Sequence, residues 1–225
     1  MSYRAPVAEM RFVMDRVLGA GRLATTERFA EASPETIDAI LGEAAKLSED
    51  VLAPLRRAGD LEPARLENGV VRATPGFAAA YRAIADGGWV GMTAAPEHGG
   101  MGLPVTLLTC VNEMMASANM ALSLCPLLSL GQIEALSAHG DAALKALYLP
   151  RLVAGDWTGT MNLTEPQAGS DVGAVRTRAE PTGDGAYAVS GTKIFISWGD
   201  HDIAENICHL VLARLPGAAA GTKGI

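Results

Sequence analysis

The chain has 225 residues, of which 49% are hydrophobic and 19% are charged, and its formal net charge at pH 7 is -7. This length and composition are typical of a globular protein with one or two domains and a sizeable core, and they argue against disorder. The acidic balance and the lack of a basic cluster argue against binding to nucleic acid or to an anionic membrane, because both require a basic surface.

The cysteines Cys110, Cys125 and Cys208 fit neither a disulfide framework nor a zinc site, since their number is odd and no pair has CxxC spacing. We interpret them as buried thiols and expect a cytoplasmic protein. The N-terminus turns charged and polar too early to form the apolar core of a secretory signal. The longest apolar run, around residues 120–130, contains Pro126 and is well short of the roughly 20 residues that span a bilayer.

Helical periodicity dominates the first 156 residues. A short helix is expected over Val7–Leu18, followed by an Ala- and Arg-rich connector. Ser33 can cap the next helix and Pro34 can occupy its first turn. One side of that helix is apolar and needs a helical partner, and it consists of Ile37, Ile40, Leu41, Ala44, Leu47 and Val51.

Later segments also begin in ways that predict helices. Thr74 and Pro75 would start one helix, and the glycines at 87–88 would stop it. The apolar side of that helix would consist of Phe77, Tyr81 and Ile84. Three more helices are expected to follow Pro104, Pro126 and Asp141.

After Asp156 the pattern changes to short alternating runs that predict strands. The expected strands cover residues 157–163, 176–180, 187–197 and 207–214. The Gly-Asp-Gly sequence at 183–185 predicts a hairpin turn between two of them, because glycine and aspartate tolerate the backbone conformations that such turns need. A helical domain followed by strands predicts an α+β fold class.

Residues 161–171, reading MNLTEPQAGSD, and residues 193–197, reading KIFIS, are the most informative segments. Taken alone, the first is a turn, in which Pro166 fixes φ and Gly169 permits conformations closed to other residues. The second, taken alone, is a half-buried strand. Together, however, they place hydroxyls and small residues beside an aromatic side chain. That combination suits the approach of a flat, hydrogen-bonding ring.

Both segments resemble the flavin-binding part of the acyl-CoA dehydrogenases, which has a T-E-P-x-A-G-S-D loop and a K-x-aromatic-I-[ST] strand. Residues 87–102 resemble the family's Pro-Glu-x-x-Gly-Gly-x-Gly loop, and residues 148–156 resemble its link from helices into sheet. The resemblance implies an N-terminal helical extension over 1–32 and a helical domain over 33–156. It also implies a truncated antiparallel β-domain over 157–225, with the C-terminal helical domain absent.

The activity implied by the resemblance is α,β-desaturation of an acyl-CoA thioester, with hydride transfer to N5 of FAD. The implied catalytic glutamate lies beyond Ile225, so the chain alone would be inactive. The residues expected to face the flavin are Met161, Leu163, Thr164, Phe195 and Ser197. Ser170 is expected to contact the acyl-CoA near its pantetheine. An electron-transfer flavoprotein is the expected electron acceptor, and the intact enzyme is expected to be a homo-oligomer.

Two other readings of the sequence remain open. One is a related flavin enzyme on the same fold, such as an acyl-CoA oxidase or a flavin-dependent monooxygenase. The other, from a different class, is a non-catalytic protein that binds flavin or acyl-CoA or lends its helices to a partner.

Trp198 departs from the family pattern, because many members have asparagine there, and we expect it to pack near the site. The WGDHD sequence at 198–202 resembles a subgroup that includes 3-methylmercaptopropionyl-CoA dehydrogenase. His201 and His209 are interpreted as structural histidines, because their spacing matches no usual metal site. Glu97 and His98 are assigned to a structural loop by the resemblance, and Glu165 is not expected to act as a base.

Overall fold

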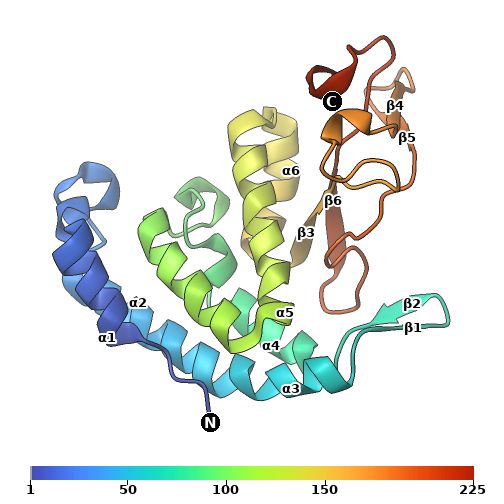
Figure 1. Cartoon of the computed structure of the whole chain (residues 1–225). Coiled ribbons are helices and arrows are strands. Elements are labelled where there is room, and N and C mark those ends of the chain that lie inside the picture. Colours follow the sequence, from blue (N-terminus) through green and yellow to red (C-terminus); the bar gives the residue numbers. More distant parts are fainter. Residues whose placement is uncertain (1) are drawn as a thin grey trace.

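The computed structural model describes residues 2–225 and has the α+β fold class that the sequence predicts (Figure 1). The α-helices are α1 (Val7–Phe12), α2 (Pro34–Lys46), α3 (Ala53–Leu61), α4 (Phe77–Asp86), α5 (Val105–His139) and α6 (Ala142–Val153). The strands are β1 (Arg65–Glu67), β2 (Val70–Arg72), β3 (Trp157–Asn162), β4 (Arg178–Pro181), β5 (Tyr187–Ser190) and β6 (Asn206–Val211). The helices lie mainly in the first two thirds of the chain, as expected.

The helices at the N-terminal end agree with the sequence pattern. A π-helical segment, Val13–Leu18, extends α1 over the range expected for the first helix. Short 3-10 turns follow it in the connector. α2 begins at Pro34, and the Ser33 hydroxyl accepts a hydrogen bond of 3.2 Å from the Thr36 N–H, which confirms the predicted cap. A second π-helical segment, Leu47–Leu52, joins α2 to α3.

The start of α4 differs from the prediction. The Thr74 hydroxyl donates a hydrogen bond of 2.8 Å to the Glu62 carbonyl and does not cap the helix. Gly76 precedes the first helical residue and has a φ of 89°, a left-handed conformation that favours glycine. The predicted stop is confirmed, since Gly88 has a φ of 71° directly after the helix.

The break in α5 lies at Asn119 and not at Pro126, so the prediction of a new helix after Pro126 is wrong. Asn119 has non-helical angles, φ -155° and ψ 86°. Its Oδ1 accepts a hydrogen bond of 3.2 Å from the Leu122 N–H, and its Nδ2 donates one of 3.2 Å to the Leu52 carbonyl. Asn119 therefore caps the second half of α5, and Pro126 lies inside that half.

α5 is the central helix of the core and packs against α2, α3, α6 and β3. By length and composition it could also cross a membrane, with a mean hydropathy of 1.4 in its most apolar window. Half of that window is buried here by the surrounding elements, as is usual for a core helix. Its own fully buried side chains include Leu107, Met114 and Leu122, and those of other elements in the same core include Leu41, Leu52, Tyr81 and Leu152.

The strands of residues 2–225 form three two-stranded sheets. β4 and β5 pair antiparallel across the predicted turn at 183–185. β3 and β6, in contrast, pair in parallel, from Trp157 opposite Asn206 to Asn162 opposite Val211. This corrects the expectation of a wholly antiparallel β-domain. The chain between them, residues 163–205, is long enough to form the crossover that a parallel pair requires.

The strand expected over residues 187–197 is only partly present, because β5 ends at Ser190. The KIFIS segment that follows is irregular. Phe195 in this segment has a φ of 59°, which no strand residue adopts. The prediction of a strand over KIFIS is therefore wrong.

Candidate functional site

The candidate site is built at the C-terminal end of β3, which lies directly against α5. The Gly159 N–H donates a hydrogen bond of 2.9 Å to the Ser129 hydroxyl. A Cβ at Gly159 would lie 2.3 Å from Gln132 Oε1 and 3.0 Å from Ser129 Cα, so the missing side chain lets β3 approach α5 closely. β3 is thereby fixed on the helices, and Met161 near its end is 43% exposed.

The TEPQA sequence after β3 forms the tight turn that the residues predict. The Glu165 N–H donates to the Ala168 carbonyl and the Ala168 N–H donates to the Glu165 carbonyl, each at 3.0 Å. Glu165 and Ala168 are both buried, whereas Pro166 and Gln167 are exposed. The turn therefore points the Glu165 side chain inward, into the β-region.

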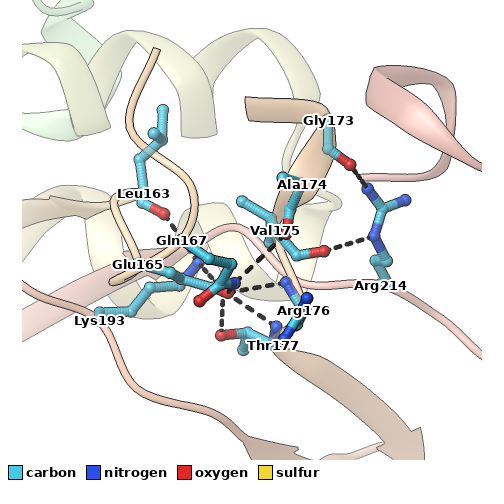
Figure 2. A network of polar contacts seen from close by, with 10 residues as sticks. All are labelled: Leu163, Glu165, Gln167, Gly173, Ala174, Val175, Arg176, Thr177, Lys193 and Arg214. Carbon is cyan, nitrogen blue, oxygen red and sulfur yellow. Dashed lines mark hydrogen bonds and ion pairs between the residues drawn. The ribbon is translucent and has the colours of Figure 1, made fainter. Parts of the chain in front are cut away.

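Glu165 is the centre of a polar network (Figure 2). Its Oε1 accepts hydrogen bonds from the Thr177 N–H at 2.9 Å, the Thr177 hydroxyl at 2.5 Å and Lys193 Nζ at 2.9 Å. Its Oε2 accepts from the Arg176 N–H at 2.7 Å and Gln167 Nε2 at 2.5 Å. Burial alone raises the pKa of Glu165, but the bonds from Thr177, Arg176 and Lys193 outweigh it and hold the pKa far below its usual range.

Lys193 connects the two segments that the sequence singles out. Besides Glu165, its Nζ donates a hydrogen bond of 3.0 Å to the Leu163 carbonyl. The N–H of Ile194 donates one of 2.9 Å to the Thr164 carbonyl. The KIFIS segment therefore lies beside the TEP turn, although 28 residues separate Glu165 from Lys193 along the chain.

The residues expected to face a flavin lie on this junction with accessible side chains. The Phe195 ring is 88% exposed, and its left-handed backbone turns it away from the core. Thr164 is half-buried and Ser197 is exposed. Among residues 2–225, neither hydroxyl has a hydrogen-bond partner, so both are available to a ligand. One exposed aromatic ring and two available hydroxyls are therefore groups that a ligand could contact.

Ser170, expected to contact acyl-CoA, lies further along the same loop. It is exposed and lies two residues before the 3-10 turn Val172–Ala174. It is close in sequence to the TEP turn, but its hydroxyl makes no hydrogen bond to Ser197 within the described chain. Its role remains a prediction.

Arg214 is a residue of this region that the sequence did not indicate. Its guanidinium donates hydrogen bonds to the carbonyls of Gly173 at 2.5 Å and Val175 at 2.7 Å (Figure 2). It also donates to Ala219 at 3.1 Å and Gly221 at 3.0 Å. Arg214 thus ties the loop after the TEP turn to the end of the chain. A single arginine in the sequence does not indicate that its side chain will donate hydrogen bonds to four backbone carbonyls.

Trp198 packs beside this region, and His201 is a buried, hydrogen-bonded histidine, as its interpretation as structural predicts. The Trp198 ring stacks on Phe77 at a centroid distance of 6.2 Å and meets the His201 ring edge-on at 5.5 Å. His201 Nδ1 accepts from the Ile203 N–H at 3.3 Å, so the proton is on Nε2, which donates to the Thr158 hydroxyl at 2.9 Å. Burial lowers the pKa of His201.

The remaining histidines, acidic residues and cysteines that the sequence analysis considered have the following surroundings. No group of three or more His, Cys, Asp or Glu side chains in residues 2–225 could hold a metal ion. His209 Nδ1 is 2.7 Å from the Thr160 hydroxyl. Glu97 and His98 lie in a short 3-10 turn, Pro96–His98, in the glycine-rich loop. The cysteines are free, and burial raises the pKa of each thiol, Cys125 above all.

Comparison with known proteins identifies the family of the chain. The family described as acyl-CoA dehydrogenase, N-terminal domain, matches residues 34–156. The chain is 46% identical over its whole length to 3-methylmercaptopropionyl-CoA dehydrogenase of Ruegeria pomeroyi and 33% identical to a butyryl-CoA dehydrogenase of Syntrophomonas wolfei. It spans 38% and 37% of the lengths of these two relatives.

Solved structures show the same fold. A probable acyl-CoA dehydrogenase from Mycobacterium abscessus matches 85% of this chain, and 46% of its own, with a TM-score of 0.66 and 27% identity. Butyryl-CoA dehydrogenase from Megasphaera elsdenii matches 71% of this chain and 40% of its own, with a TM-score of 0.61 and 25% identity. The chain belongs to the acyl-CoA dehydrogenase family of oxidoreductases.

Proposed function

We propose that this chain supplies the helical domain and part of the flavin-binding β-region of an FAD-dependent acyl-CoA dehydrogenase. The observation that supports it most is the junction of the TEP turn with the KIFIS segment, held by Lys193 and by the Ile194 N–H. The segments joined there carry an exposed aromatic ring, Phe195, and two hydroxyls, of Thr164 and Ser197.

The domain limits proposed are 1–32 for an N-terminal extension, 33–156 for the helical domain and 157–225 for the β-region. The cofactor proposed is FAD, which when bound would accept a hydride from the substrate and supply the redox chemistry. Thr164 and Ser197 would donate hydrogen bonds to its ring system. Met161, Leu163 and Phe195 would shield the ring from water.

The substrate class proposed is an acyl-CoA thioester, whose pantetheine would lie near Ser170. Electrons would pass to an electron-transfer flavoprotein, and the intact enzyme would be a cytoplasmic homo-oligomer. The 46% identical relative makes 3-methylmercaptopropionyl-CoA a substrate to test first.

The base that removes the α-proton is proposed to come from residues after Ile225. Glu165 is unsuited to the task. A general base needs an accessible lone pair and a pKa near the working pH. The Glu165 carboxylate is 3% exposed and accepts hydrogen bonds from Thr177, Arg176, Gln167 and Lys193. Glu165 therefore holds the loop in place and does not remove the substrate's proton.

The experiment uses the product of the complete reading frame. We expect a yellow protein with bound FAD that reduces an artificial electron acceptor when given an acyl-CoA. Thr164→Val and Ser197→Ala should each weaken FAD binding about fivefold, the usual worth of one hydrogen bond. Ser137→Ala, an exposed change on α5, is the matched control. A colourless protein with no FAD affinity would refute the proposal, and rapid oxygen consumption instead of dye reduction would indicate an oxidase.

A further inference from the structure

Trp198 has a backbone conformation that its side chain disfavours. Its φ is 55°, in the left-handed region. The Gly199 N–H donates a hydrogen bond of 3.1 Å to the Ile196 carbonyl, which closes a tight turn with Trp198 in the third position. Turns with a positive φ at this position favour glycine or asparagine, and a bulky residue there is strained. Such a residue persists where its surroundings hold it in place.

The contacts that hold Trp198 come from the helical part of the protein. Its indole Nε1 donates a hydrogen bond of 3.0 Å to the Ala121 carbonyl, in the second half of α5. Its ring stacks on Phe77, the first residue of α4, with an angle of 29° between the planes. These two contacts fix the ring from two different helices.

The same loop is attached to the helical part a second time at Asp202, four residues after Trp198. Asp202 accepts hydrogen bonds from the Ala73 N–H at 2.9 Å and from the Arg72 guanidinium at 3.1 Å. Arg72 is the last residue of β2, and Figure 1 shows the β1–β2 hairpin near the loop that leads into β6. The 198–202 loop is therefore attached to the helical part at both of its ends.

We propose that Trp198 is a positioning residue that sets where Phe195 and Ser197 stand relative to the helices. The inference rests on the proposed function, since Phe195 and Ser197 matter as flavin-facing residues. Both side chains are exposed and make no hydrogen bond to the helices within residues 2–225. The indole next to Ser197 is therefore the nearest point at which this segment is fixed to α4 and α5.

Trp198 would act by preorganising the loop. A loop held in its bound conformation before the ligand arrives loses less conformational entropy on binding. Without the indole contacts, the strained turn can relax, and residues 195–197 sample other positions while Lys193 and Ile194 stay bound to the TEP turn. Binding of FAD would then have to restore the order that Trp198 now maintains.

The first test is Trp198→Phe in the full-length protein, which keeps a ring for stacking on Phe77 but removes the N–H donor. We expect FAD affinity, measured by fluorescence titration of the apoprotein, to fall about fivefold. The fluorescence of bound FAD should rise, because a looser segment shields and quenches the ring less. Trp89→Phe is the matched control, since Trp89 is also half-buried and its indole makes no hydrogen bond within residues 2–225.

A second variant, Trp198→Asn, suits the left-handed turn but lacks both contacts. If Trp198 only served the turn, this change would preserve FAD affinity and raise the melting temperature. We expect a larger loss of affinity than with Trp198→Phe, without loss of the fold. Wild-type affinity and fluorescence in both variants would overturn the inference while leaving the proposed function intact. Failure of the wild-type protein to bind FAD would instead refute the proposed function.

Discussion

Lys193 Nζ lies 2.9 Å from Glu165 Oε1, and only 9% and 3% of the two side chains are exposed. Burying an ion pair costs desolvation free energy, which is offset only where further hydrogen bonds satisfy both groups. Here Thr177 and Arg176 supply those bonds to the carboxylate, and the Leu163 carbonyl accepts one from Lys193. The pair therefore fixes the relative position of two segments of the candidate site.

Glu165→Gln should destabilise the protein strongly. The change removes the negative charge and leaves Lys193 buried without its partner, and breaking a buried pair in this way costs about 3–5 kcal/mol. Urea denaturation followed by circular dichroism would measure the loss in free energy of unfolding.

The control for this change is Glu43→Gln. Glu43 pairs with Lys46 on the surface, at 2.6 Å, with 62% and 68% of the side chains exposed. Exposed pairs contribute about 0–1 kcal/mol. Equal losses of stability from the two substitutions would contradict the assigned role of Glu165.

The Glu165 contribution should depend on pH. Its pKa in the folded protein lies below its ordinary value of 4.5, because the hydrogen bonds to the carboxylate outweigh the opposing effect of burial. Because the pKa is lowered, the ionised carboxylate stabilises the folded state at pH values above the ordinary pKa of 4.5. This stabilisation is lost as the pH falls below that value. The difference in free energy of unfolding between the wild-type protein and Glu165→Gln should therefore narrow between about pH 5 and pH 3. A constant or widening difference would show that another group dominates the pH dependence of the free energy of unfolding.

The elements that the sequence predicts correctly depend on local interactions. The Ser33 cap with Pro34 in the first turn and the hairpin turn at 183–185 involve residues a few positions apart. The two segments that meet at the junction are also recognisable in the sequence, because TEPQAGSD and KIFIS are short and contiguous. Family resemblance then supplied the roles that spacing alone could not.

The features that the sequence did not predict depend on distant partners. Lys193 belongs to an alternating run, but its side chain turns toward Glu165 and the run forms no strand. Arg214 finds four carbonyls on segments far apart in the chain. The residues next to Lys193 and Arg214 in the sequence carry no pattern that would indicate these hydrogen-bond partners.

Asn119 should be needed for the break in α5. It is 1% exposed, and its amide both accepts from the Leu122 N–H and donates to the Leu52 carbonyl. Asn119→Ala removes both hydrogen bonds and leaves the Leu122 N–H without its cap, which costs about 1–3 kcal/mol. Thermal unfolding would show a lower melting temperature. Asn112→Ala, on the same helix and with no side-chain hydrogen bond in the described structure, should change it little; a similar drop there would argue against the cap.

Two glycine-to-alanine substitutions should have opposite effects on stability. A Cβ at Gly100 would lie 2.1 Å from the Ala94 carbonyl oxygen, so the backbone of the glycine-rich loop must move to admit it. Gly42 lies inside α2 with no atom within 4 Å of an added Cβ. Alanine is the better helix former by about 1 kcal/mol.

Gly100→Ala should therefore lower the free energy of unfolding, and Gly42→Ala should raise it by about 0.5–1 kcal/mol. Urea denaturation of both variants under the same conditions gives the comparison. The Gly100 substitution should also disturb the backbone bonds that the loop makes to itself, from the Met101 N–H to Gly91 and from the Leu103 N–H to Met92. Faster amide exchange at Met101 and Leu103 would report that movement. Stabilisation by Gly100→Ala would mean that the loop accommodates a methyl group without strain.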